Sequence, residues 1–256
     1  EAYTIPTSSM EKSMLIGDFL FVSKVAYGPR VPMTPLAVPL VHHTIPGTKI
    51  KSYSENIKLP YHRMKGLGTV KRNDCVVFNW PDEKLGRPID KKENYVKRCV
   101  GLPGDTIEII NSILMVNGSP QEEKIGIKNQ WNYSIKTTGM GLNPNILYEK
   151  YDITEGGRGK NRNEYILKLT NENYNALKRF QSISSINKII EKPSTYAENI
   201  FPHKDNFKWN VDNYGPLIIP KYGVTTYIDV NNITLYKSII ERYEKNDLEI
   251  INDDIY

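Results

Sequence analysis

Short apolar segments bounded by turn residues recur in the first 118 residues, and this pattern predicts β-strands. A turn followed by a strand occupies residues 15–28, and a second strand lies within residues 71–81. Residues 95–102 predict a third strand, which we expect to be buried because most of its side chains are apolar. Glycines and a proline at positions 101–104 then turn the chain.

Two β-hairpins follow from alternating apolar positions around short turns. Residues 104–118 alternate on either side of Asn111 and Ser112, which predicts a hairpin with a two-residue turn. Residues 246–256 repeat this pattern but stop inside the second strand. A strand ending there would leave backbone groups unpaired, so we expect the natural chain to continue beyond Tyr256.

The alternation weakens between these hairpins. We expect residues 1–118 and about 214–256 to form a β-rich core, its C-terminal part incomplete, and residues 119–213 to form an inserted, less regular α+β lobe. A short strand between two turns is expected in residues 213–223.

Helical spacing appears in two places. After Thr170 a helix is expected, with apolar side chains three residues apart at Tyr174, Leu177 and Phe180. A second helix is expected over residues 232–243, its apolar face formed by Leu235, Ile239, Ile240 and Tyr243.

Residues 29–70 are rich in proline and glycine and predict an extended loop or hairpin arm on the surface. The prolines of this segment are Pro29, Pro32, Pro35, Pro39, Pro46 and Pro60.

The composition is that of a folded, soluble domain. The chain has 256 residues, of which 39% are hydrophobic and 25% are charged, and its net charge is +5. These values allow one large core, or one core and a lobe. The basic residues show no nucleic-acid-binding motif. The histidines, His42, His43, His62 and His203, lack metal-ligand spacing, so we expect no metal and no cofactor.

The two cysteines, Cys75 and Cys99, lie in apolar strand-like segments. We expect buried thiols, which behave as small hydrophobic groups. A disulfide stays possible if the two strands are neighbours in an oxidising compartment.

The candidate chemistry lies in a serine and a lysine. Ser9 stands in a polar turn, and Lys97 stands in the predicted third strand. A serine hydroxyl becomes nucleophilic when a base takes its proton, and a lysine can be that base only when it is neutral. Burial among apolar side chains lowers a lysine pKa toward that state. Taken singly, Ser9 could belong to an ordinary turn and Lys97 could extend its amine to solvent.

Together, the blocks around these residues resemble bacterial type I signal peptidases, the membrane-bound Ser/Lys enzymes that remove signal peptides from exported proteins. The family's serine block, Pro-Ser-x-Ser-Met-x-Pro-Thr-Leu, stands here as Pro-Thr-Ser-Ser-Met-Glu-Lys-Ser-Met in residues 6–14. Its lysine block, Tyr-Ile-Lys-Arg-x-x-Gly-Leu-Pro-Gly-Asp, is matched almost fully by residues 95–105. The resemblance implies Ser9 as nucleophile, Lys97 as general base and an antiparallel signal-peptidase-like β core.

The resemblance also implies that the Thr7 hydroxyl and the Ser9 N–H stabilise the oxyanion. It implies shallow apolar pockets that suit an Ala-x-Ala cleavage signal, bound extended by strand addition. The expected substrate-binding residues are Ile5, Pro6, Met10, Met14, Leu20, Val76, Tyr95 and Val96.

The expected partners are the signal peptides of secretory preproteins and membrane lipid. No run of about 18 apolar residues occurs here, so we expect no transmembrane helix within these residues. The resemblance implies a membrane anchor just before Glu1. The catalytic domain would then face the outer, periplasmic or extracellular side of the cytoplasmic membrane.

The chain departs from the family pattern in three places. Lys12 and Ser13 replace the usual Pro-Thr, and Asn73 replaces a glycine before Asp74, where a left-handed backbone is expected. The family's last block, Gly-Asp-Asn-Arg-x-Asn-Ser-x-Asp-Ser-Arg, is absent from these residues.

Two alternative functions stay open. A self-cleaving repressor peptidase uses a similar Ser/Lys pair, but those chains carry a helix-turn-helix and a cleavage loop that the sequence does not show. A non-catalytic export or scaffold module could keep the fold without the activity, although Thr7, Ser9 and Lys97 are all retained.

Overall fold

The computed structural model describes residues 2–122, 126–252 and 254–256. The chain divides into two compact units, Glu1–Leu102 and Pro103–Tyr256, each of which is described by itself. Strands are more abundant than helices, and all pairings among the described strands are antiparallel. The predicted mostly β fold is therefore confirmed.

Two short ribbons form the regular part of the first unit. β1 (Ala2–Thr4) pairs with β2 (Phe19–Phe21), and β3 (Cys75–Asn79) pairs with β4 (Asn94–Arg98). The 3₁₀ turn η1 (Ser8–Met10) follows β1, and a second one, η2 (Ile89–Lys91), precedes β4. The three strands expected in this region are present.

The expected burial of the third strand was wrong. β4 is half-buried, and its Tyr95 side chain is 39% exposed. The physical reason is that a ribbon of two strands covers neither of its faces completely.

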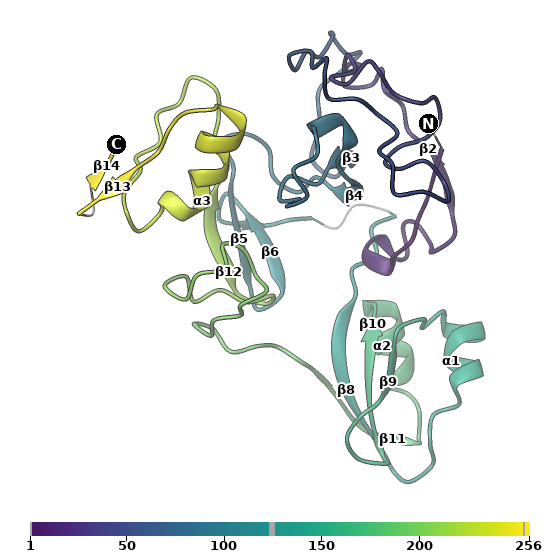
Figure 1. Ribbon diagram of the computed structural model, residues 1–256. Helices are drawn as coiled ribbons and strands as arrows, with labels where there is room; N and C mark the ends of the chain where they lie inside the picture. Colours follow the sequence, from purple (N-terminus) through teal and green to yellow (C-terminus); the bar gives the residue numbers. More distant parts are fainter. Residues whose placement is uncertain (1, 123–125, 253) are drawn as a thin grey trace. The chain divides into compact units, whose positions relative to one another are not determined.

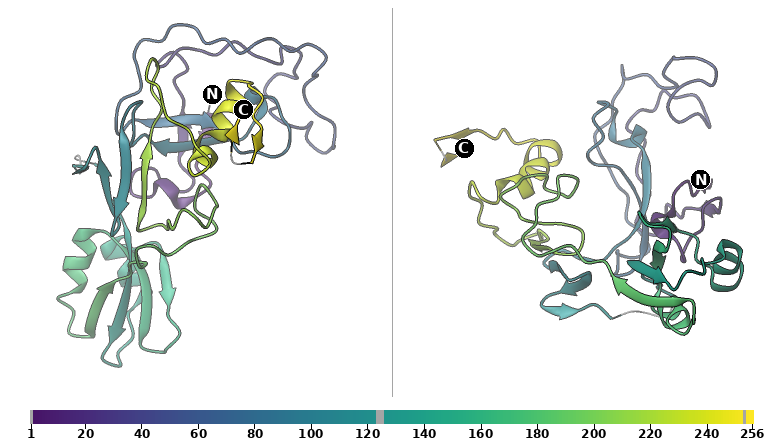
Figure 2. Two further views of the ribbon diagram at one scale, coloured as in Figure 1. Left: turned by 90° about the vertical axis from the view of Figure 1, so that its left-hand side faces the viewer. Right: turned by 90° about the horizontal axis from the view of Figure 1, so that it is seen from below.

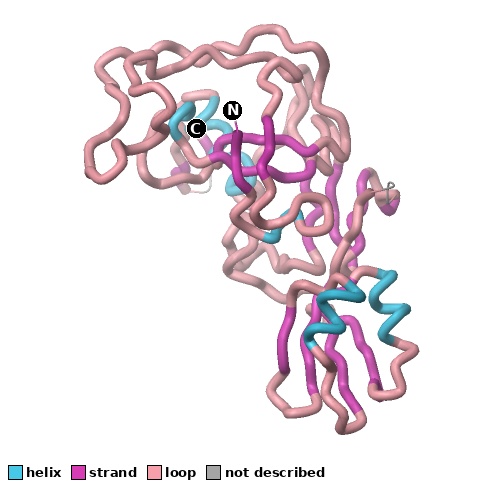
Figure 3. The backbone as a smooth tube through the Cα atoms, turned by 90° about the vertical axis from the view of Figure 1, so that its right-hand side faces the viewer, coloured by secondary structure: helices cyan, strands magenta, loops and turns pink. Residues whose placement is uncertain are grey.

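Residues 29–70 form the predicted hairpin arm, drawn almost wholly as loop in Figure 3 and in the purple-blue range of Figure 2. Isolated antiparallel bridges join Arg30 to Arg63, Ala37 to Tyr53 and Thr44 to Lys51, so the arm doubles back on itself.

Two features fix the base of this arm. A Cβ on Gly28, whose φ is +88°, would lie 1.9 Å from the Met64 carbonyl oxygen, so only glycine allows this approach. Asp90 Oδ2 accepts hydrogen bonds from Met33 N, Thr34 N and Thr34 Oγ1 at 2.9–3.0 Å. The arm is therefore attached to the residues that lead into β4.

The second unit contains a four-stranded sheet whose strands follow the order β12 (Tyr214–Ile218), β5 (Thr106–Ile110), β6 (Ile113–Val116) and β7 (Ser119–Pro120). The predicted hairpin joins β5 to β6. Asn111 and Ser112 have φ values of 49° and 67°, which is the geometry of a type I′ turn. β12 returns beside β5 after a long excursion of the chain. The inserted lobe over residues 119–213 stays a prediction.

The residues of this predicted lobe contain a second four-stranded sheet, labelled in Figure 1, with the order β11 (Ile183–Lys188), β8 (Trp131–Thr137), β10 (Glu164–Leu169) and β9 (Gly156–Arg158). Tyr133 and Ile135 of β8 are buried together with Tyr165 and Leu167 of β10, while the intervening side chains are polar or exposed. The segment is thus more regular than its overall sequence pattern suggests.

Two helices complete the core of this sheet. α2 (Asn171–Leu177) is the helix expected after Thr170, whose Oγ1 accepts a capping hydrogen bond from Asn173 N at 3.2 Å. Leu177 is buried, and Tyr174 and Phe180 pack against the same core, so the predicted apolar face is confirmed. α1 (Pro144–Tyr151), which contributes the buried Leu147, was not predicted.

The C-terminal region contains the second predicted helix, but its buried face differs. α3 (Ile233–Ser238) continues into a π-helical turn, η3 (Ile239–Tyr243). Ile233 and Tyr236 are buried, whereas Ile239 and Tyr243 are 37% and 49% exposed. In the wider π-helical turn, side chains point in directions that differ from those of a regular α-helix. A prediction based on the 3.6-residue period therefore assigns them to the wrong face.

The last residues form the expected second hairpin, in which β13 (Ile250–Ile251) pairs with β14 (Asp254–Ile255). Glu249 and Tyr256 exchange both backbone hydrogen bonds at 2.9 Å. The backbone of the final residue is thus paired, which the sequence pattern alone did not lead us to expect.

The lobe core yields a stability prediction. Ile135→Ala removes a side chain that is fully buried, and we expect it to lower the free energy of unfolding by about 2–5 kcal/mol. Ile166→Ala is the matched control, because Ile166 is 47% exposed in the neighbouring strand. Urea denaturation of both variants measures the difference, and equal losses would contradict this account of the core.

Candidate active site

The strand β4 holds Lys97 through its pairing with β3. Lys97 lies opposite Val76, and Tyr95 lies opposite Phe78, so these four side chains share one face of the ribbon. Val96 points to the other face, where it lies opposite Val77. The face of Lys97 is extended by Trp80, whose ring lies 4.8 Å from that of Tyr95.

The turn η1 holds Ser9. Met10, the residue after Ser9, is buried, and the Met10 carbonyl accepts hydrogen bonds from Ser13 N and Met14 N at 3.0 and 2.8 Å. The buried Ile5 closes the loop through backbone bonds with Asp18 and Gly17, each 2.9 Å. η1 packs against β4, so a loop and a strand of the same unit bring Ser9 and Lys97 together.

The two candidate catalytic groups are in direct contact. Lys97 Nζ lies 2.5 Å from Ser9 Oγ and donates to the Val96 carbonyl at 3.0 Å. Thr7 Oγ1 lies 3.3 Å from Ser9 Oγ. A hydroxyl within hydrogen-bond reach of an amine is the arrangement that general-base activation of a nucleophile requires.

Burial lowers the pKa of Lys97 from its ordinary value of 10.5. Removing water from the ammonium disfavours the charged form, and the neutral amine is the form that can take a proton from serine. The desolvation is partial, because Lys97 is half-buried.

The structure places the expected substrate-binding residues in three settings. Ile5 and Met10 are buried, whereas Pro6 and Tyr95 are exposed. Met14, Leu20, Val76 and Val96 are half-buried. Of the residues near Lys97, Val76 and Tyr95 lie on its face of the ribbon, whereas the Val96 carbonyl accepts a hydrogen bond from Lys97 Nζ.

The cysteines lie close to this site. Cys75 lies opposite Arg98 in the ribbon, and both Cys75 and Cys99 are reduced, as predicted. The expectation that both are buried was wrong, since Cys75 is exposed and Cys99 is half-buried. The open face of the two-stranded ribbon explains the difference.

Sequence reasoning missed the polar contacts around the site. Arg98 donates from Nη2 to Ser13 Oγ and from Nη1 to the Asn73 carbonyl, both at 2.9 Å. Tyr27 donates to Asp74 Oδ2 at 2.7 Å, and this bond to a carboxylate raises the pKa of Tyr27 to about 12. The one sequence feature that indicated these contacts was the arginine that directly follows Lys97 in the motif.

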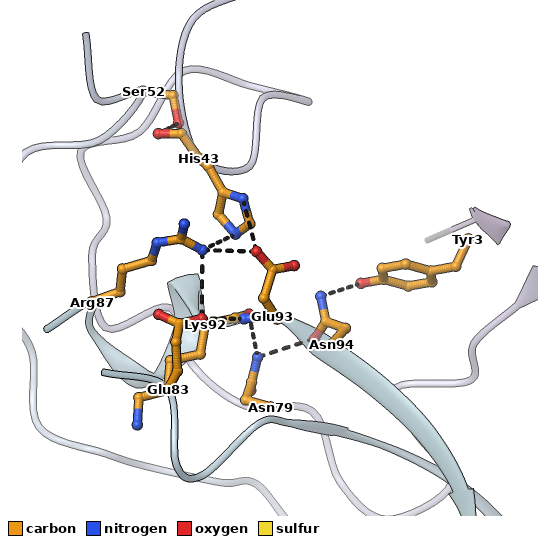
Figure 4. A network of polar contacts seen from close by, with 9 residues as sticks. All are labelled: Tyr3, His43, Ser52, Asn79, Glu83, Arg87, Lys92, Glu93 and Asn94. Atoms are coloured by element: carbon orange, nitrogen blue, oxygen red, sulfur yellow. Dashed lines mark hydrogen bonds and ion pairs between the residues drawn. The ribbon is translucent and has the colours of Figure 1, made fainter. Parts of the chain in front are cut away.

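A polar network joins the arm to the strands that carry the site (Figure 4). Arg87 Nη1 lies 3.0 Å from both His43 Nε2 and Glu93 Oε1, and Glu83 Oε2 accepts a hydrogen bond from Glu93 N at 2.9 Å.

The same network continues into the ribbon of β3 and β4. Asn79 Nδ2 donates to the Lys92 carbonyl and to Asn94 Oδ1 at 3.1 and 3.0 Å. Asn94 Nδ2 in turn contacts the Tyr3 hydroxyl at 3.5 Å.

The described residues contain no group of three histidine, cysteine, aspartate or glutamate side chains able to hold a metal ion. Across the same residues, no helix combines the length and hydropathy needed to cross a bilayer.

Comparison with known proteins identifies relatives. The family model for "Signal peptidase, peptidase S26" matches residues 1–186. A protein named signal peptidase I from Pseudomonas aeruginosa is 33% identical over 126 residues, which are 49% of this chain and 33% of that protein. A protein named signal peptidase I from Buchnera aphidicola is 28% identical over 246 residues, which are 87% of this chain and 58% of that protein.

A third relative, signal peptidase I of Rickettsia prowazekii, is 29% identical over 120 residues, covering 46% of this chain and 35% of that protein. The chain thus spans between about a third and three fifths of the length of these relatives. No solved structure matches significantly.

The network in Figure 4 gives a pH prediction. Burial, the Arg87 guanidinium and His42 lower the pKa of His43 from 6.5. Glu93 and Glu83 act in the opposite direction, but their effect is smaller. The folded protein therefore binds this proton less readily than the unfolded chain. Its contribution to stability is complete above about pH 6.5 and is lost as the pH falls below that value.

We expect His43→Gln, whose side chain stays neutral, to reduce the loss of stability between about pH 7.5 and pH 5.5. Thermal unfolding across this range measures the effect, with His62→Gln, a change at an exposed histidine, as control. A pH dependence identical in all three proteins would contradict the assignment.

Proposed function

Because this chain belongs to the signal peptidase family, peptidase S26, we propose that it is a serine endopeptidase that removes signal peptides from exported preproteins. The observation that carries the proposal is the 2.5 Å contact between Ser9 Oγ and Lys97 Nζ. The lowered Lys97 pKa supports it, because a neutral amine beside the hydroxyl is what this chemistry needs.

In the proposed mechanism, neutral Lys97 takes the proton of Ser9 as the serine oxygen attacks the carbonyl carbon of the scissile bond. The Thr7 hydroxyl and the Ser9 N–H stabilise the oxyanion. Lys97 then gives its proton to the leaving amine of the mature protein, which leaves an acyl-enzyme. Finally, Lys97 takes a proton from water as the water oxygen attacks the acyl carbon. Lys97 then returns the proton to Ser9 Oγ as the acyl–Ser9 bond breaks, which releases the signal peptide.

The substrate is proposed to bind extended beside the ribbon that carries Lys97. In the part of the chain that the structure describes, β4 pairs only with β3, so an edge is available for strand addition. Val76 and Tyr95 offer an apolar surface on the face of Lys97, which suits the small side chains of an Ala-x-Ala signal. The remaining expected residues, of which Ile5 and Met10 are buried, are kept as proposals: Ile5, Pro6, Met10, Met14, Leu20 and Val96.

Membrane association on the outer face of the cytoplasmic membrane is part of the proposal. Supporting it, Phe19 and Phe21 of β2 are 78% and 90% exposed, and the nearby Leu15 and Ile16 are also exposed. Large exposed apolar side chains in one short segment are typical of interaction surfaces, including surfaces that meet lipid.

The deciding experiment is cleavage of a preprotein that bears an Ala-x-Ala site, using the full-length natural protein in detergent. We expect Ser9→Ala and Lys97→Ala each to lower kcat/KM by about 10⁴-fold or more, because each removes one half of a unit that acts together. Ser23→Ala and Lys84→Ala, at exposed positions, are the matched controls. An absence of cleavage by the unmutated protein would favour a non-catalytic export module instead.

The oxyanion role of Thr7 is tested separately. Thr7→Val keeps the shape of the side chain but removes the hydroxyl, and we expect kcat to fall by about 10²–10³-fold with little change in KM. Thr7→Ser restores the hydroxyl and is expected to recover most of the rate. Equal activity of the valine and serine variants would exclude this role.

A further inference from the structure

Arg98 makes contacts that the proposed chemistry does not use. It follows Lys97 directly in β4, so its side chain leaves the opposite face of the strand. Its guanidinium nevertheless reaches the loop that carries the nucleophile, because Nη2 donates to Ser13 Oγ at 2.9 Å. The same guanidinium donates from Nη1 to the Asn73 carbonyl at 2.9 Å.

Both acceptors are themselves held by the backbone. Ser13 N donates to the Met10 carbonyl at 3.0 Å, and Met10 is the buried residue next to Ser9. Asn73 has a φ of 76°, and its N–H donates to the Cys99 carbonyl at 2.7 Å. Arg98 therefore connects three segments: the Ser9 loop, the turn before β3 and β4 itself.

The geometry of the dyad depends on the distance between that loop and that strand. Ser9 stands four residues before Ser13, and Lys97 stands one residue before Arg98, so the two contacts join the same two segments. Another contact between β4 and the N-terminal segment, from Asn94 to Tyr3, is longer at 3.5 Å and lies at the far end of the strand. A displacement of about 1 Å at a reacting centre can cost about 10²-fold in rate.

We propose that Arg98, through Ser13 and Asn73, is a positioning residue that holds the Ser9 loop against β4 and so maintains the Ser9–Lys97 contact. This inference rests on the proposed function, which it deepens. Ser13 and Asn73 are also two of the positions at which the chain departs from the family pattern, and in the structure they meet at one side chain.

The test uses the full-length protein and a preprotein substrate. Ser13→Ala removes the acceptor of a charge-assisted hydrogen bond, and we expect kcat to fall roughly tenfold with KM nearly unchanged. Ser13→Thr keeps the hydroxyl and should restore the rate. Ser23→Ala, an exposed serine outside these contacts, should match the unmutated protein.

A second readout separates positioning from general stability. When the loop moves away, Lys97 gains water, its pKa rises, and the acid limb of the pH–rate profile moves to higher pH. NMR titration of the lysine side chains measures the same change without relying on turnover. Arg98→Lys, which keeps the charge but not the two-pronged geometry, should shift the profile in the same direction as Ser13→Ala.

The outcomes are distinct. An unchanged rate and an unchanged Lys97 titration in Ser13→Ala would overturn the positioning role. A lower unfolding temperature with an unmoved pH profile would also overturn it, since that result describes a purely structural bond. Absence of cleavage by the unmutated protein would refute the proposed function alone, and the Lys97 titration of the variants would still decide the role of Arg98.

Discussion

The contact between Lys97 and Ser9 imposes the main constraint on the first unit. A lysine acts as a base near neutral pH only if its amine is taken out of water, and each unit of pKa change requires about 1.4 kcal/mol of differential solvation. A two-stranded ribbon cannot bury an amine by itself, and Lys97 is indeed only half-buried. The η1 turn, which packs against β4, supplies further cover. The segment that carries Ser9 therefore also helps to desolvate Lys97, so in the proposed mechanism activation and positioning depend on one contact.

The two units are stabilised in different ways. Among the described side chains, the buried hydrophobic residues of the first unit are Ile5, Met10 and Tyr53, whereas the core of the second unit gathers side chains from β8, β10, α1 and α2. The first unit relies on polar contacts between segments distant in the sequence, such as Asp90 with Thr34 and Arg87 with His43. Each such bond contributes only about 0.5–1.5 kcal/mol net, so the surroundings of the site depend on many small terms.

This difference explains what could be predicted from the sequence. The strands around Lys97, the Asn111-Ser112 turn and the helix after Thr170 follow local rules of pattern, turn chemistry and capping, and the structure contains all three. The lobe sheet was underestimated because the strict alternation of β8 covers only seven residues within a long irregular segment. The α3 face was misplaced because a π-helical turn has no signature in a 3.6-residue period.

In the candidate site, too, residues within a local motif could be predicted, whereas contacts between residues distant in the sequence could not. Ser9, Lys97 and Thr7 could be named from their motif, and the structure brings the three together. The partners of Arg98 could not be named, because a bond between residues 85 positions apart leaves no periodic trace in the sequence. Arg98 receives its acceptors from Ser13 and Asn73, both within Glu1–Leu102. The contacts proposed to position Ser9 against Lys97 thus lie within one unit.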